Sequence, residues 1–127
     1  MNNALPENFL REKSKRFAMR IVKLYQHVSE KSREGVLSKQ ILRSGTSIGA
    51  NVCEAQYAQS QKDFVSKMSI ALKESAETEY WLELLHEGDF ITRKQFDSLR
   101  EDCIELLKML TATVNTTKRK IRLGEKI

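Results

Sequence analysis

Glycine and proline are scarce in this sequence, with 5 glycines and 1 proline among 127 residues. Both residue types interrupt regular structure, and β-sandwiches and barrels need many of the tight turns that they form. Their scarcity argues against a fold of that kind and favours an all-helical protein.

Cysteine is also rare, and the two cysteines, Cys53 and Cys103, lie far apart inside helical patterns. Zinc and redox sites use closely spaced pairs such as C-x-x-C, and disulfide frameworks use more cysteines than this. We therefore expect two reduced thiols that pack inside the protein.

Long hydrophobic runs are missing as well. No stretch approaches the ~20 apolar residues that cross a bilayer. The first residues, MNNALPENFLREK, lack the apolar segment of a signal peptide. The sequence therefore predicts a soluble, cytoplasmic protein that makes no membrane contact.

The residues that are present can build a core, because 40% of them are hydrophobic and the length suits one domain. Apolar residues recur with the period of an amphipathic helix in four segments. These segments cover about residues 6–32, 36–59, 61–87 and 93–117. Short connections make successive helices neighbours, which predicts an antiparallel up-and-down four-helix bundle over residues 1–117. Residues 118–127 form a basic tail.

Two helix starts carry a capping pattern, in which a hydroxyl residue is followed three positions later by an acid or amide. Ser60 with Asp63 opens the third segment, and Thr92 with Gln95 opens the fourth. In the second segment, Gly45 and Gly49 cost helix propensity of about 1 kcal/mol each. This cost indicates a site where another helix approaches the backbone closely.

The third segment has an unusually wide apolar arc. Ile70, Trp81 and Leu85 lie on a sector beside its main apolar stripe. An arc of this width predicts self-association, with an interface between copies of the chain. A wider core within one copy is the alternative, and the sequence does not decide between them.

Charge is distributed unevenly, with 22 basic and 17 acidic residues and a net charge of +5. Six side chains of the first segment project within about an 80° sector beside its apolar stripe. This basic ridge comprises Lys13, Arg16, Arg20, Lys23, His27 and Lys31, and the tail adds Lys118, Arg119, Lys120, Arg122 and Lys126. Such cations can neutralise successive phosphates of a nucleic acid. The alternative is a solvated helix face, or one that pairs with acidic helices of a neighbouring copy.

Polar residues follow one edge of the second segment at three- and four-residue spacing. This polar seam comprises Arg43, Ser44, Ser47, Asn51 and Glu54. We expect it to bond a neighbouring helix or subunit and to fix the register, with Glu79 as a candidate partner for Arg43. A catalytic role is not supported, because His27 and His86 are isolated and no serine has a histidine base with an orienting group.

Other catalytic patterns are missing. The sequence contains no glycine-rich phosphate loop, no H-E-x-x-H and no carboxylates paired with histidine at E-x-x-H spacing. We therefore expect no enzyme activity, no cofactor and no metal.

Two blocks of the sequence carry a family resemblance. They are QILRSGTSIGANVCEAQ (40–56) and SKMSIALKESAETEYWLELL (66–85). Together they resemble the bacterial four-helix bundle proteins called 23S rRNA intervening-sequence proteins. The matching positions are Arg43, Ser44, Ser47, Ile48, Asn51, Val52 and Glu54, then Ala71, Lys73, Glu74, Glu77, Thr78, Tyr80, Trp81 and Leu82.

The resemblance implies a bundle that assembles into a ring-like homopentamer, has no known enzymatic activity and contacts RNA or DNA. A related branch is similar to the accessory variability determinant of diversity-generating retroelements, which partners a reverse transcriptase. The candidate partners are therefore further copies of the chain, nucleic acid, and a reverse transcriptase or ribosome-related protein. Because fold is shared more widely than function, the functional part of this inference is an analogy.

Two functional hypotheses follow. The first is a homo-oligomeric bundle that binds structured RNA or other nucleic acid through the basic ridge, aided by the tail. The second is a scaffold that docks a protein partner through acidic helices or exposed apolar sectors. An enzyme that uses Ser47, Asn51 and Glu54 has no base, metal or cofactor site to support it.

Overall fold

The computed structural model describes the backbone of residues 5–124, and in that range all regular structure is α-helical. The helices are α1 (Leu5–Lys31), α2 (Val36–Ala55), α3 (Gln61–Glu87) and α4 (Arg93–Arg122). This confirms the all-helical prediction and its four segments.

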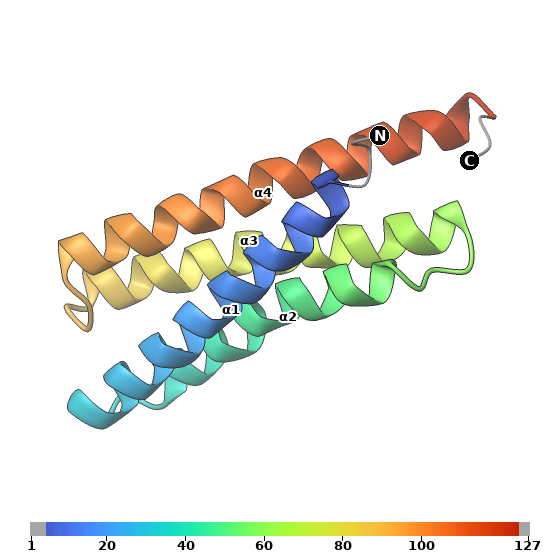
Figure 1. The fold of residues 1–127 in the computed structure, drawn as a ribbon. Helices are drawn as coiled ribbons and strands as arrows, with labels where there is room; N and C mark the ends of the chain where they lie inside the picture. The colour runs from blue at the N-terminus through green and yellow to red at the C-terminus, as the bar shows by residue number, and fades with distance from the viewer. Residues whose placement is uncertain (1–4, 125–127) are drawn as a thin grey trace.

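The chain reverses direction at each connection, and each helix lies beside the ones before and after it (Figure 1). Gly45 lies against Ile21 and Gly49 against Ser14, so residue numbers fall along α1 as they rise along α2. The first and last helices also meet, but α1 packs more extensively on α2 than on α4. This loose α1–α4 side carries the basic ridge.

Helix ends follow local hydrogen bonds. The Ser60 hydroxyl accepts from the Asp63 N–H at 3.0 Å, as the capping pattern predicts, while the Asp63 carboxylate accepts from the Gln59 N–H at 3.1 Å. Thr92 and Gln95 form a complete capping box. These bonds fix where α3 and α4 begin.

The second helix is shorter than predicted and ends at Ala55 instead of residue 59. The N–H groups of Gln56, Tyr57 and Ala58 donate to carbonyls three residues back, which tightens the chain out of the α-helix. The periodic pattern of apolar residues carries no information about this change.

A capping device that the sequence pattern did not reveal begins α2. Its N-cap, Gly35, has no side chain to offer, and the Glu34 carboxylate takes that role. Glu34 oxygens accept from the N–H groups of Val36, Leu37 and Ser38 at 3.2, 3.1 and 2.9 Å. Three of the donors that a helix start leaves unsatisfied are thereby bonded.

The core is one continuous cluster of apolar side chains from all helices. It confirms the predicted stripes, including Phe17 and Ile21 of α1 and Leu106 and Leu110 of α4. Leu85 belongs to this core with an exposed fraction of 0%. Its assignment to a subunit interface was therefore wrong, because another chain cannot reach it.

The glycines of α2 permit a close approach of α1, as predicted. A Cβ at Gly45 would lie 2.8 Å from Ile21 Cγ1, whereas one at Gly49 would lie 3.4 Å from the Ser14 carbonyl oxygen. Only the first distance is too short for real atoms. Gly45 is therefore the position where the α1–α2 packing requires glycine.

Both cysteines are free thiols. Cys103 is fully buried and its Sγ lies 3.2 Å from the Ser75 carbonyl oxygen, whereas Cys53 is partly exposed. Burial, with a smaller effect of the Glu79 carboxylate, raises the pKa of the Cys103 thiol to about 12. Cys103 thus behaves as a packed apolar group.

Candidate nucleic-acid interface

The basic ridge lies along the edge of α1 that faces α4. Two of its cations are bonded within the chain. The Lys13 ammonium lies 2.6 Å from Glu105, and the Arg20 guanidinium lies 2.7 Å from Asp102 and 2.8 Å from the Ser98 hydroxyl.

This pairing engages two of the predicted phosphate contacts in bonds within the chain. The sequence hypothesis had considered acidic partners on a neighbouring copy, but the acids belong to α4 of the same chain. The sequence could have predicted this pairing from the spacing of the α4 residues. Ser98, Asp102 and Glu105 recur at intervals of three and four, so they share one edge of α4. That edge complements the ridge.

Three ridge cations remain exposed. Arg16, Lys23 and Lys31 form no ion pair with any residue that the structure describes. From Arg16 to Lys31 they extend over about 22 Å, given a rise of 1.5 Å per residue. They are the part of the ridge that can meet phosphates.

An open hollow separates the second half of α1 from the start of α4. Its volume is about 340 Å³, and its lining comprises Arg20, Lys23, Leu24, His27, Gln95 and Leu99. Leu24 and Leu99 are 6% and 4% exposed, so they form an apolar floor beneath polar and basic side chains.

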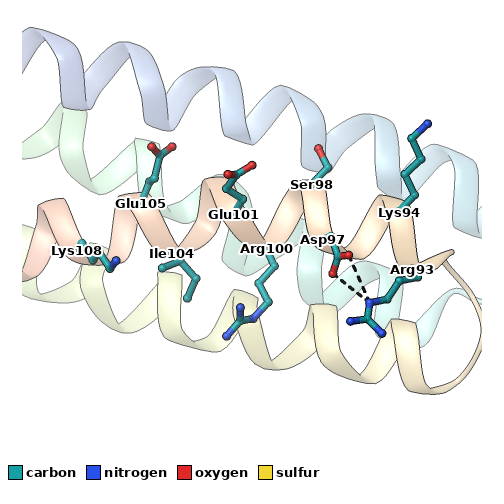
Figure 2. A pocket seen from close by; sticks show the side chains of 9 residues that line it. All are labelled: Arg93, Lys94, Asp97, Ser98, Arg100, Glu101, Ile104, Glu105 and Lys108. Carbon is teal, nitrogen blue, oxygen red and sulfur yellow. Dashed lines mark hydrogen bonds and ion pairs between the residues drawn. The ribbon is translucent and has the colours of Figure 1, made fainter.

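The outer surface of α4 is also hollowed, as Figure 2 shows. There Ser98 and Glu105 extend toward α1, while Arg93 and Arg100 extend toward the opposite side. Arg93 Nε bonds Asp97 Oδ1 at 3.3 Å. Charges of both signs alternate along this surface, so it lacks the single sign that phosphate binding requires.

The predicted basic tail is helical as far as Arg122 and continues α4. Lys118, Arg119, Lys120 and Arg122 are exposed and make no ion pair with another described residue. Lys126 lies outside the described residues. These four cations lie within five residues, little more than one helical turn, and form what we call the basic end of α4.

The basic end lies further along α4 than the contact of the ridge with that helix. Lys13 pairs with Glu105, so Lys118 is displaced from Lys13 by about 20 Å along α4, at 1.5 Å per residue. Cations in the last turn also suit the negative end of the helix dipole, which is a structural role that needs no ligand.

The polar seam of α2 faces α3. Arg43 bonds two carboxylates of α3, Glu74 at 3.4 Å and Glu77. The Ser44 and Thr78 hydroxyls lie 2.8 Å apart and are both buried. These contacts fix the register of the two helices, as the sequence analysis expected.

The remaining residues of the polar seam are Ser47, Asn51 and Glu54. Glu54 pairs with Lys67 at 3.2 Å, while the Ser47 and Asn51 side chains bond carbonyls of their own helix. The partner proposed for Arg43 was wrong, because Glu79 pairs with Arg100 of α4 at 3.0 Å. The seam is therefore built within one chain.

The other predicted interface residues remain at the surface of α3. Ile70 is 39% exposed, and Trp81 is partly buried with its Nε1 donating to Glu77 Oε2 at 2.9 Å. The neighbouring Tyr80 is 53% exposed and packs edge-on against Trp81. This apolar and aromatic surface is available to a partner.

Within residues 5–124, the structure holds no helix long and apolar enough to span a bilayer. Nor do the side chains described there include a cluster of three histidine, cysteine, aspartate or glutamate groups suited to a metal ion.

Comparison with known proteins identifies similar chains. The family model described as 23S rRNA-intervening sequence protein matches residues 7–112. Among solved structures, a protein of unknown function from the S23 ribosomal protein family of Bacteroides thetaiotaomicron VPI-5482 is 53% identical, with a TM-score of 0.82. That match covers 83% of this chain and 97% of the other. No curated protein matches the chain.

Proposed function

We propose a function from the premise that this chain belongs to the 23S rRNA-intervening sequence protein family. The chain is a non-enzymatic helical bundle that binds nucleic acid, and structured RNA is the first candidate ligand. In this proposal the bundle is antiparallel, up-and-down, and assembles into a ring-like homo-oligomer. Exposed cations of α1 and α4 provide the binding surface.

One observation carries the proposal. Arg16, Lys23 and Lys31 project from one edge of α1 without acidic partners among the described residues, and the basic end of α4 adds further exposed cations. A row of uncompensated cations suits the phosphate backbone, which is contacted irrespective of sequence. Lys13 and Arg20 instead hold α1 against α4.

Charge reversal at the exposed cations tests this surface. We expect Arg16→Glu with Lys23→Glu to weaken binding to a structured RNA by at least tenfold at low salt, because two phosphate contacts become repulsive. The matched control is Lys39→Glu with Lys73→Glu, which makes the same charge change on α2 and α3 at exposed positions. Equal losses in both double variants would remove the ridge as the binding site.

Arg20 is unsuitable for this test. Arg20→Glu would place a second carboxylate beside Asp102 and would break the contact of α1 with α4. A loss of binding in that variant would therefore report on the fold as much as on the ligand.

Assembly is tested separately. In the proposed ring, Ile70, Tyr80 and Trp81 lie between copies, since exposed apolar and aromatic groups are typical of interface centres. Light scattering is expected to give a mass that is a multiple of 14.7 kDa, with five copies as the first candidate. Ile70→Lys with Tyr80→Lys is expected to lower that mass, and a monomeric wild type would contradict the ring.

A protein-docking role is the second candidate, because the same α3 surface suits a partner such as a reverse transcriptase or ribosome-related protein. Capture of a defined partner that survives nuclease treatment and is lost in the Ile70 and Tyr80 variant would favour it. Its dependence on α3 rather than α1 separates the two proposals.

A further inference from the structure

We propose that the hollow between α1 and α4 receives one unpaired base of the bound nucleic acid. The inference rests on the proposed function and adds base recognition to it. Its starting point is the mixed lining, in which Leu24 and Leu99 form an apolar floor and Lys23, His27 and Gln95 supply charge and hydrogen-bonding groups.

The size of the hollow limits its occupant. A volume of about 340 Å³ lies at the lower end of the ~300–1,000 Å³ range of small-ligand sites, which suits one ring system and not a helix. Bases within an RNA duplex are stacked and paired, whereas bases in loops and bulges can be turned outward onto protein side chains.

Arg20 gives this site a fixed planar group. Two of its nitrogens are held by Asp102 at 2.7 Å and Ser98 at 2.8 Å, so the edge of the guanidinium is occupied and its charge is largely compensated. Such a group makes a poor phosphate contact. The flat faces of a guanidinium can still stack on a base, which needs no net charge.

The neighbouring side chains provide the other contacts that a nucleotide needs. Lys23 is exposed and has no ion-pair partner in the described part of the chain, so it can meet the phosphate beside the base. The Gln95 Oε1 accepts from the Thr92 N–H, which holds the amide in place. Its Nε2 donates to no other described group and can therefore bond a base edge.

Two RNA hairpins that differ by one bulged nucleotide test the site. At fixed salt, we expect the bulged hairpin to bind the wild-type oligomer about tenfold more tightly than the fully paired one, since stacking of one base is worth about this factor. The phosphate backbone is nearly the same in both hairpins. The difference in affinity therefore reports on the unpaired base.

Gln95→Glu is the variant that assigns the preference to the hollow. Glutamate keeps the acceptor that caps α4 but removes the Nε2 donor, so the thermal midpoint is expected to stay within a few degrees. We expect the preference for the bulged hairpin to fall below about twofold, while Gln40→Glu, a matched charge change at an exposed position of α2, keeps it.

Each other outcome overturns the inference. Equal binding of both hairpins by the wild type would remove the base site and leave the salt-sensitive phosphate surface intact. A tenfold preference that persists in Gln95→Glu would place the base elsewhere. Absence of binding to either hairpin would remove the proposed function as well, and would make an acidic protein segment the better occupant of the hollow.

Discussion

At the scale of single residues, the two glycines of α2 differ in what they permit. Gly45→Ala is expected to destabilise the fold by about 1–2 kcal/mol, because the new methyl group meets Ile21, a stiff β-branched side chain, at 2.8 Å. Gly49→Ala meets Ser14 at 3.4 Å and gains helix propensity, so it is expected to be neutral or to stabilise by up to about 1 kcal/mol. Urea unfolding measures both changes, and a loss of similar size in both variants would contradict the packing described.

The two thiols also differ as single residues. Raising the pKa of Cys103 from 9.0 to about 12 leaves about a thousandfold less thiolate at pH 8, and its side chain is fully buried. We therefore expect one label per chain when the native protein reacts with an alkylating reagent, and that label on Cys53. Two labels at equal rates would show that Cys103 is accessible.

The same shift has a consequence for stability. Because the pKa of Cys103 is higher in the folded than in the unfolded chain, folding favours the protonated thiol. This contribution is complete below about pH 9 and is lost as pH rises from there toward 12. Cys103→Ala is therefore expected to have a smaller loss of stability than the wild type between those limits, measured by denaturant unfolding.

At the scale of the elements, the start of α2 depends on the residue before its N-cap. Glu34→Ala is expected to destabilise the protein by about 1 kcal/mol, because three backbone N–H groups lose their acceptor. Glu30→Ala removes a carboxylate four residues earlier at an exposed position and is expected to change stability by less than about 0.5 kcal/mol. Equal effects in a chemical-denaturation series would show that the cap contributes nothing.

The contact of α1 with α4 is the other element-scale feature with a direct test. A double-mutant cycle of Arg20→Met and Asp102→Asn is expected to give a coupling of about 0.5–1 kcal/mol, the range for a partly exposed pair. The two side chains are 40% and 34% exposed, so solvent screens part of their attraction. A coupling of zero would mean that apolar packing alone holds α1 in place.

For the whole molecule, the sequence predicted the features that depend on the position of a residue within its own helix. The 3.6-residue period placed Phe17, Ile21 and Leu106 in the core, and local spacing placed the caps at Ser60 and Thr92. These features depend on neighbours three or four residues apart, which the sequence shows directly.

The features that failed depend on which neighbour covers each face of a helix. At ~100° per residue, Glu79 lies about 140–160° around α3 from Glu74 and Glu77, so it pairs with Arg100 of α4 while those two carboxylates pair with Arg43 of α2. Leu85 likewise lies on the wide arc of α3, and only the packed structure shows that it is covered by its own chain. Periodicity gives the faces of one helix but not the neighbour that each face meets.

In the candidate site, too, the sequence predicted some features and missed others. The sequence placed all ridge cations on one side of α1, and the structure keeps them on one edge of the bundle. It could not separate Lys13 and Arg20, which α4 neutralises, from Arg16 and Lys23, which stay exposed. Because Lys13 and Arg20 are paired within the chain, the proposed binding surface has fewer phosphate contacts than the sequence predicted.

The most direct test of the central claim is the salt dependence of RNA binding by the wild-type protein, with its mass measured in the same buffer. If about four of the exposed cations reach phosphates, log Kobs falls against log salt with a slope of about −3 to −4. A fourfold rise in salt then weakens binding by about a hundredfold. A correctly assembled protein whose affinity is flat with salt, or that does not bind RNA at low salt, would contradict the account.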